Sequence, residues 1–381
     1  MCGTADSKRK ITLGLALLAY DGDEQQLSRE KMNQCLKQYQ DWLGKLTTVW
    51  GPAYHLTNKS AIMIPALKKA PQLDSMAFMV QDQEHPGDYY LAIRGTNPEN
   101  LAEWIFQDFW VGNTVAWDKV PYEETTPPPE SSPDIPAISF GTNIALTILM
   151  NLRDELSGKK IAAFLQDLVN SRDESAQKIS LYITGHSLGG VLASTFHLLL
   201  HEKWQSLETS RSKPDFYSYA YAGPTAGNQQ FAERFKLLGE FSKRFANNLD
   251  VATKVWNPVD MQMLPALYHQ AGISMPGLMA KLLNDIAIPA IQNKGYTQIE
   301  TWQEIPSQIV PSFNHYLAQM IYQHLIPYIS DFLRECPQSN KQRLIKLIES
   351  WEIFTSFKNS EPLSAHKNKN LQYYFDFLTG C

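Results

Sequence analysis

The chain has 381 residues, of which 44% are hydrophobic and 19% are charged, and its formal net charge is −5 at pH 7. This composition is typical of an ordinary globular protein with enough apolar residues for a sizeable core. The mild negative charge argues against a basic nucleic-acid-binding surface, and no stretch approaches the roughly 18 apolar residues that a membrane-spanning helix needs.

The N-terminus resembles a signal peptide only superficially. A basic cluster at residues 8–10 precedes an apolar run, but acidic residues follow at once and no clear cleavage site is present. We therefore expect a first helix of the folded domain here. The sequence leaves two localisations open, the cytoplasm and export by a non-standard route.

Helical and strand-like patterns alternate along the chain. Helices are expected over most of roughly the first 70 residues, including residues 28–46, and at residues 140–156 and 159–169. Strands are expected at residues 75–82, 88–96, 178–184, 216–223 and 251–257. Six prolines in residues 120–136 predict an irregular excursion. The alternation predicts an α/β fold with a largely parallel sheet and right-handed crossovers.

A serine between two glycines follows the strand expected at residues 178–184. Ser187 lies in Gly-His-Ser-Leu-Gly, with Gly185 and Gly189 two positions away on either side, and an apolar helical run comes next. A nucleophile at the tip of a sharp strand-to-helix turn requires such glycines, because side chains there would clash. The helix start also offers backbone N–H groups and the positive end of a dipole. A phosphate-binding loop is a weaker interpretation, because neither the P-loop nor the GxGxxG pattern is present.

Three motifs in this order resemble the class 3 lipases, the fungal-lipase-like branch of the α/β-hydrolases, in a bacterial-type member. They are AIRGT at residues 92–96, GHSLGG at residues 185–190 and YAGPTAGNQQFAERF at residues 221–235. The resemblance covers roughly residues 75–330 and implies an α/β-hydrolase fold, with a mostly parallel central sheet flanked by helices and a lid segment. We expect one hydrolase domain over residues 1–330, with the lid at about residues 97–136. Residues 331–381 are expected to form a helical C-terminal extension packed on the same domain.

Two carboxylates compete for the role of the triad acid. In α/β-hydrolases the acid and then the histidine follow the serine along the chain. Asp250 precedes the strand expected at residues 251–257, and Asp260 follows it. Only the carboxyl end of a neighbouring parallel strand shares the sheet edge of Ser187, which favours Asp260. Asn257, Asp260 and the Leu-Pro that follows also resemble the family's acid motif. Asp260 is therefore the expected acid, and Asp250 is the alternative.

Two histidines compete for the role of general base. His324 and Tyr328 resemble the family's Gln-His with a tyrosine a few residues on. Pro327 favours a helix break beside His324, because proline disfavours helix in the residue before it. His324 is the expected base. His315, which also lies at a loop-to-helix boundary, is the alternative.

The resemblance also implies an oxyanion hole and a lid. One oxyanion donor is expected from the backbone N–H of Leu188, and the second from Thr96, where Gly95 lets the backbone approach. The segment that follows resembles the family's lid, a short amphipathic helix whose apolar side covers the pocket in water. Its apolar residues include Leu101, Trp104, Ile105 and Phe109. A plain core helix is the alternative for this segment, and the prolines of residues 120–136 offer another cover.

The cysteines and the paired histidines give no metal-binding pattern. The cysteines are Cys2, Cys35, Cys336 and Cys381. They lack CxxC spacing and histidine partners, so we expect reduced thiols. His197 and His201 lie four residues apart, but the glutamate of an HExxH motif is missing. A surface or core role is therefore expected for both histidines, and no metal site.

The sequence therefore predicts a lipase that hydrolyses carboxylic esters of acylglycerols through an acyl-enzyme. Ser187 would attack the ester, His324 would accept its proton, and Asp260 would orient His324. This chemistry requires no metal or organic cofactor. The expected partner is a lipid or ester substrate at a lipid–water interface, without nucleic acid, and the oligomeric state is left open. The alternatives are a phospholipase A1, a short-chain carboxylesterase, and a catalytically silent lipid-binding protein.

Overall fold

The computed structural model describes residues 4–20, 27–55, 75–95, 110–124, 126–172, 177–204, 213–299, 302–311 and 313–332. The strands within them are β1 (Leu46–His55), β2 (Ser75–Asp82), β3 (Asp88–Ile93), β4 (Thr114–Ala116), β5 (Ala137–Ser139), β6 (Ser180–His186), β7 (Asp215–Tyr221), β8 (Ser242–Ala246) and β9 (Gln303–Glu304). Seven of these strands form one sheet in the order β1-β2-β3-β6-β7-β8-β9, and β4 pairs with β5 alone.

The central sheet is mostly parallel, as the sequence predicts. β1, β2 and β3 form an antiparallel meander, and β3, β6, β7, β8 and β9 then run parallel to one another. In the register, Ile93 pairs with Gly185 and His186 pairs with Tyr221. The carboxyl ends of these parallel strands therefore meet at one edge, where binding and catalytic residues of α/β proteins gather.

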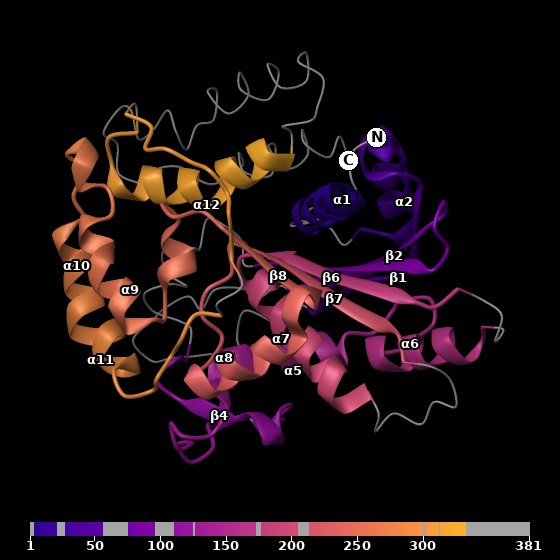
Figure 1. Ribbon diagram of the computed structural model, residues 1–381, viewed down its shortest axis with the longest axis horizontal. Helices are drawn as coiled ribbons and strands as arrows, with labels where there is room; N and C mark the ends of the chain where they lie inside the picture. The colour runs from indigo at the N-terminus through magenta and orange to yellow at the C-terminus, as the bar shows by residue number, and fades with distance from the viewer. Residues whose placement is uncertain are drawn as a thin grey trace.

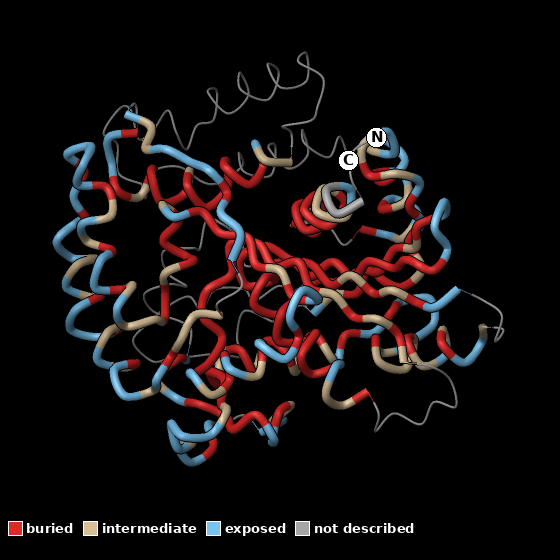
Figure 2. The backbone as a smooth tube through the Cα atoms, in the orientation of Figure 1, coloured by how far each residue is buried: buried red, intermediate tan, exposed pale blue. Residues whose placement is uncertain are grey.

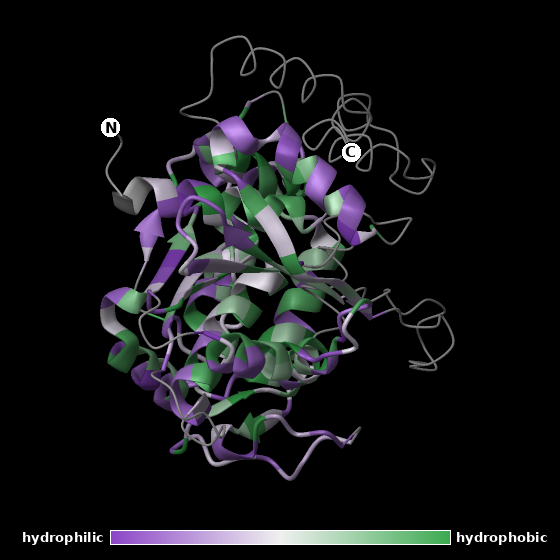
Figure 3. Cartoon of the chain, turned by 90° about the vertical axis from the view of Figure 1, so that its right-hand side faces the viewer, coloured by the Kyte–Doolittle hydropathy of each residue, from purple (hydrophilic) through white to green (hydrophobic). Residues whose placement is uncertain are grey.

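Helices cover both faces of the sheet (Figure 1). One face carries α1 (Thr4–Leu18), α2 (Arg29–Gln38), α3 (Gln40–Leu43) and α12 (Tyr316–Phe332). The other face carries α5 (Phe140–Asn151), α6 (Ile161–Asn170), α7 (Leu188–Lys203) and α8 (Gln229–Phe235). Figure 2 shows the strands buried between these layers, and Figure 3 shows many hydrophobic residues in the helices beneath the sheet.

Strand β6 shows how the sequence specifies this three-layer arrangement. Leu181 and Ile183 point to one face and join the core cluster that contains residues of α5 and α7. Tyr182, between them, packs against the clusters on the opposite face, which contain residues of α1. Side chains alternate along a strand, so a strand covered on both faces reads as a continuous run of large residues.

Shorter elements lie around these layers. The 3₁₀ helices are η3 (Trp117–Lys119), η5 (Lys236–Phe241), η6 (Val251–Lys254), η7 (Leu264–Ala266) and η8 (His269–Ala271). A group of helices follows the parallel strands: α9 (Pro258–Met263), α10 (Gly277–Leu282), the π-helix η9 (Leu283–Ala287) and α11 (Ile288–Ile291). None of the helices in the described part of the chain is both long and apolar enough to cross a bilayer.

The first helix is present as expected, but the expectation of helix is wrong at residues 46–55. The chain there forms β1, in which Thr47, Thr48, Val49 and Trp50 supply the β-branched and aromatic residues that favour strands. Cys35 is disulfide-bonded, so the expectation of four reduced thiols is also wrong. The expected C-terminal extension, residues 331–381, lies outside the described residues except for its first two positions.

The strand expected at residues 251–257 is absent, and β8 takes its place in the sheet. Residues 251–254 form the 3₁₀ helix η6 instead. The Asp250 side chain accepts a hydrogen bond from the backbone N–H of Ala252 at 2.9 Å, and the Thr253 hydroxyl donates to the Asp250 carbonyl at 2.8 Å. Such local bonds compete with strand pairing and override the β propensity of Val251, Thr253 and Val255.

Candidate active site

Ser187 occupies the tip of a strand-to-helix turn. β6 ends at His186, α7 begins at Leu188, and Ser187 between them has φ 60° and ψ −126°. A positive φ is costly for a serine and persists only where surrounding contacts enforce it. Its N–H donates to the Tyr221 carbonyl at 2.9 Å, and its carbonyl accepts from the Gly190 N–H at 2.9 Å. The geometry expected of a nucleophile elbow is therefore present.

The glycines beside Ser187 are required by close backbone contacts. A Cβ built on Gly185 would lie 2.3 Å from the carbonyl carbon and oxygen of Gly189. A Cβ on Gly189 would lie 2.2 Å from the carbonyl oxygen of Ile93, at the end of β3. Separations below about 3 Å are far inside van der Waals contact. The clash inferred from the sequence spacing is thus confirmed at both positions.

His324 and Asp250 form a buried pair. The His324 Nδ1 lies 3.0 Å from both carboxylate oxygens of Asp250, and the two side chains are 1% and 0% exposed. Asp250 also accepts hydrogen bonds from the Tyr328 hydroxyl at 2.9 Å and from the Ala252 N–H at 2.9 Å. With Nδ1–H donating to the carboxylate, Nε2 of neutral His324 is left as the proton acceptor.

The expected pairing of Asp260 with His324 is wrong. Asp260 lies in the first turn of α9, where the Asn257 side chain accepts from its N–H at 3.1 Å, and its carboxylate accepts from Gln298 Nε2 at 3.3 Å. The sheet-edge rule holds, but the strand lies earlier in the chain than expected. β8, which is separated from β6 by β7 and runs parallel to both, ends at Ala246, so Asp250 is the carboxylate that follows its carboxyl end.

His324 pairs with a buried carboxylate, but it does not lie beside the expected helix break. α12 runs from Tyr316 to Phe332 and continues through Pro327. His324 therefore projects from within a long buried helix. His315 is exposed and precedes the helix, and the Asp250 carboxylate pairs with His324 instead.

His186 connects the elbow to the backbone of His324. Its Nε2 lies 2.8 Å from the His324 carbonyl oxygen and its Nδ1 lies 3.0 Å from the Tyr20 hydroxyl. Burial, with the charge of His324, holds the pKa of His186 well below its usual range, so the ring is neutral. A carbonyl can only accept, so Nε2–H donates to it and Nδ1 accepts from Tyr20. Burial raises the pKa of Tyr20 and keeps its hydroxyl protonated, although the charge of Arg94 opposes this.

The Tyr20–His186 pair is not among the site residues predicted from the sequence, because the sequence gives no local signal for it. Tyr20 follows α1 and lies 166 positions before His186. The two rings meet edge to face at a centroid distance of 5.8 Å, and the rings of His186 and His324 lie 4.6 Å apart. The chain just after the N-terminal helix thereby reaches the elbow, and Tyr20 and His186 form a chain of contacts that ends on the backbone and ring of His324.

Replacement of Tyr20 by phenylalanine should lower kcat on a soluble ester by about tenfold while KM stays nearly constant. The variant leaves Nδ1 of His186 without its donor, which loosens the bond that holds the His324 backbone. Tyr89→Phe is the matched control, because that buried hydroxyl bonds Gln81 near the opposite end of β3. Equal losses of kcat in the two variants would contradict the positioning role.

The oxyanion and lid residues are only partly within the described chain. Leu188 is buried and is the first residue of α7. Thr96 and the lid residues Leu101, Trp104, Ile105 and Phe109 lie outside the described residues. The chain just before Thr96 does reach the elbow, since a Cβ on Gly95 would lie 2.4 Å from the His186 carbonyl oxygen and 2.2 Å from the Tyr20 hydroxyl.

Ser187 Oγ is buried and lies within reach of the Tyr20 hydroxyl, but no hydrogen bond of good geometry joins it to a described residue. In unliganded enzymes the bond between nucleophile and base is often long and tightens only when substrate binds. Its neighbour His186 is already in contact with His324 through the ring and the carbonyl. The arrangement therefore places a constrained serine beside a histidine that a buried carboxylate orients.

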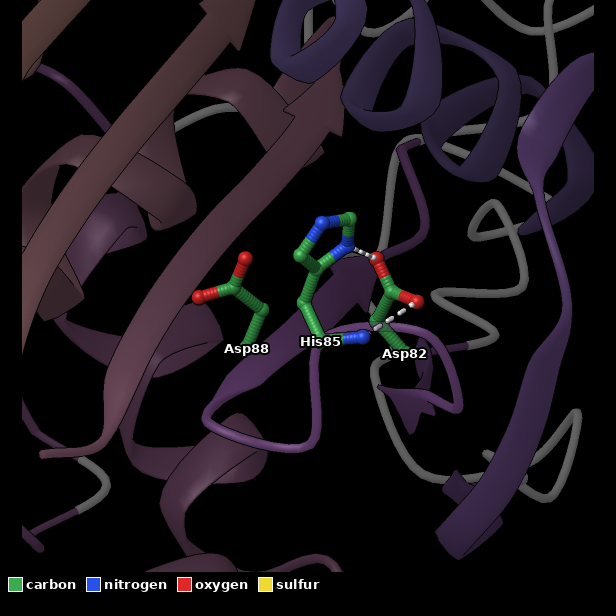
Figure 4. A group of neighbouring side chains, drawn as sticks. All are labelled: Asp82, His85 and Asp88. Atoms are coloured by element: carbon green, nitrogen blue, oxygen red, sulfur yellow. Dashed lines mark hydrogen bonds and ion pairs between the residues drawn. The ribbon is translucent and has the colours of Figure 1, made fainter. Parts of the chain in front are cut away.

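One carboxylate–histidine group resembles a metal site in composition. The ligand atoms of Asp82, His85 and Asp88 lie within 4.8 Å of one another on the turn between β2 and β3 (Figure 4). Asp82 accepts from the backbone N–H groups of Glu84 and His85 and from the His85 ring, and Asp88 pairs with Lys8. These bonds explain the group as a turn and an ion pair. It lies at the amino end of β3, opposite the edge that carries Ser187.

His197 and His201 do not form a metal site either. Their ring centroids are 6.5 Å apart, and His197 Nδ1 lies 2.9 Å from the Ser218 hydroxyl. Burial, aided by the nearby charges of His201 and Lys213, lowers the pKa of His197 to about 3. His197 is thus a neutral core residue that joins α7 to β7.

Comparison with known proteins finds lipases similar to this chain. The family model "Lipase (class 3)" matches residues 90–259, a span that contains Ser187 and Asp250 but ends before Asp260. The crystal structure of M37 lipase is 28% identical, with a TM-score of 0.71 and coverage of 86% of this chain and 95% of that chain. Lipase II from Rhizopus niveus is more distant, at 17% identity, a TM-score of 0.44 and coverage of 68% and 78%.

A plant enzyme matches a shorter segment. Phospholipase A1-Igamma1, chloroplastic, from Arabidopsis thaliana is 34% identical over 82 residues, which are 22% of this chain and 16% of that enzyme. The chain thus matches only a small part of the length of this curated relative. The family match spans the elbow and Asp250, and the M37 similarity covers nearly the whole fold. Residues 90–259 therefore match the class 3 lipases, and the chain has the α/β-hydrolase type of fold.

Proposed function

We propose that this protein is a lipase that hydrolyses carboxylic ester bonds of acylglycerols with Ser187, His324 and Asp250 as its triad. The observation that carries the proposal is the buried His324–Asp250 pair, with Nδ1 at 3.0 Å from both carboxylate oxygens, next to the Ser187 elbow. The match of residues 90–259 to the class 3 lipases and the similarity to M37 lipase support an ester substrate.

Each group has a defined part in the proposed reaction. Ser187 Oγ attacks the ester carbonyl as His324 Nε2 accepts its proton, and Asp250 stabilises the imidazolium that results. The alcohol leaves with that proton, and a water activated by His324 then hydrolyses the acyl-enzyme. The backbone N–H groups of Leu188 and Thr96 are the proposed oxyanion donors, and one such donor is typically worth about 10²–10³ in kcat.

We also propose the boundaries and the lid inferred from the sequence. Residues 1–330 would form the hydrolase domain, with residues 331–381 as an extension packed on it. Leu101, Trp104, Ile105 and Phe109 would supply the apolar side of a lid within about residues 97–136. The described residues on either side of residues 96–109 support this placement, because Gly95 contacts the elbow and the Val111 carbonyl accepts a hydrogen bond from the Tyr296 hydroxyl.

Hydrolysis of matched short-, medium- and long-chain esters, together with a diacyl phospholipid, tests the function. Turnover of long-chain acylglycerols, with stoichiometric labelling of Ser187 by an alkylphosphonate inhibitor, is the expected result. Activity confined to short chains would identify a carboxylesterase, and preferential release of the sn-1 fatty acid from phospholipid would identify a phospholipase A1. Neither turnover nor labelling would overturn the proposal in favour of a silent lipid-binding protein.

A further inference from the structure

An exposed apolar face lies on the helices that follow Asp250. It consists of Val259 and Met263 on α9, Leu278 on α10 and Ile286 on η9, which are 68%, 50%, 74% and 56% exposed. Ten large hydrophobic side chains are exposed in the described part of the chain, and these four lie within one short segment of it. Soluble proteins rarely expose several large apolar side chains together unless the surface meets a partner or a membrane.

The spacing of these residues gives the face a defined direction. α10, η9 and α11 follow one another without a break from Gly277 to Ile291. Leu278 and Ile286 are two helical turns apart on the outer side, whereas Leu283, Ala287 and Ile291 are buried on the inner side. Both sides of this helical run are therefore apolar. The inner side fills the core, and the outer side has no such purpose within the fold.

Charge is also depleted along the segment. Residues 258–292 contain three charged side chains, Asp260, Lys281 and Asp285. Charged residues are therefore less than half as frequent in this segment as in the whole chain, where they make up 19%. Lys281 and Asp285 form an ion pair with each other. A solvated surface helix normally carries many charges. The near absence of charge matches an uncharged apolar phase better than it matches water or an anionic membrane.

The helices that carry the face lie at the catalytic edge of the sheet. Figure 1 shows α9, α10 and α11 together at the end of the sheet where the parallel strands finish. A Cβ on Gly112 would lie 3.8 Å from Ala290 of α11, and the Tyr296 hydroxyl donates to the Val111 carbonyl at 2.7 Å. Gly95, in turn, contacts the elbow.

We propose that Val259, Met263, Leu278 and Ile286 bind the surface of an uncharged lipid aggregate and hold the catalytic edge against it. The inference rests on the proposed lipase function and adds a lipid-contact surface separate from the lid segment. The face affects adsorption to the lipid surface, which precedes the reaction. It determines how much enzyme is adsorbed and not how fast an adsorbed enzyme cleaves an ester.

Adsorption to a triolein emulsion, measured in a Ser187→Ala background, tests the face without interference from hydrolysis. The variant Leu278→Gln/Ile286→Gln should weaken adsorption by at least about tenfold. The matched control is Leu156→Gln/Leu237→Gln, which removes two leucines that are 71% and 76% exposed on the α5–α6 connection and on η5. Its adsorption should stay within about twofold of the parent.

Activity provides the second measurement. With Ser187 restored, the ratio of triolein hydrolysis to soluble-ester hydrolysis should fall about tenfold in Leu278→Gln/Ile286→Gln and stay constant in the control. Equal adsorption of the two double variants would overturn the inference. So would a dimer that Leu278→Gln/Ile286→Gln converts to a monomer without loss of adsorption, because the face would then contact a second copy. Face-dependent adsorption without any ester hydrolysis would support the face and overturn the proposed function.

Discussion

Replacement of Ser187 by alanine should lower kcat for a soluble short-chain ester by about 10⁴–10⁶-fold. The alanine removes the atom that forms the acyl-enzyme, so the histidine and the carboxylate have no nucleophile to activate. Rate enhancement that remains would come from the oxyanion donors and from substrate binding, which act without the serine. A soluble ester is the appropriate substrate, because its turnover does not depend on adsorption to lipid.

Ser194→Ala is the matched control for Ser187→Ala. Ser194 is also buried, and it lies on the same helix, α7. It should retain kcat within about threefold, because a buried hydroxyl on a helix contributes at most a local hydrogen bond. If Ser187→Ala kept more than a few per cent of the activity, another nucleophile would be at work and the elbow would be only structural.

The elbow could be predicted from the sequence because its constraints are local. Gly185, Ser187 and Gly189 are close in the chain, and the clashes that require the glycines arise within the turn itself and with the end of β3. The strand at residues 75–82 could be predicted for a similar reason. Five consecutive buried residues in β2 give a strong apolar signal between polar ends.

The strand β8 could not be predicted, because its buried face contains a charge. Arg244 is 5% exposed, yet its guanidinium donates to the carbonyls of Gly223 at 2.9 Å and Thr253 at 3.1 Å. Lys243 beside it lies over the Tyr219 ring. A short strand with two adjacent basic residues looks like a surface loop, because the partners that make burial of the arginine tolerable are distant in sequence.

The position of this one strand decides which carboxylate is expected to be the acid. If residues 251–257 are the strand, the edge rule selects the carboxylate after it, Asp260, and rejects the one before it. With β8 at Ser242–Ala246, the same rule selects Asp250. Tyr20 could not be found by any local rule, because its bond to His186 joins the end of the first helix to the elbow. Long-range contacts of this kind depend on how the layers pack.

The exchange of Asp250 for asparagine should therefore lower kcat by about 10³–10⁴-fold, whereas Asp260→Asn should stay within about threefold. Asparagine at residue 250 presents an amide that can donate to His324 Nδ1, which stabilises the tautomer with the proton on Nε2. The base is then blocked on the side that must accept the proton of Ser187. Asp260→Asn alters a partly exposed group bonded to Gln298 and leaves the His324 tautomer unchanged.

Asparagine separates the chemical effect at residue 250 from a structural one better than alanine does. Asp250→Ala would leave the His324 Nδ1–H and the Tyr328 hydroxyl buried without their acceptor, at a cost of about 1–3 kcal/mol for each group. That variant should unfold more easily, so its loss of activity would be ambiguous. If Asp260→Asn lost more activity than Asp250→Asn while both stayed folded, the acid would be Asp260, and the 3.0 Å pair in the core would serve stability alone.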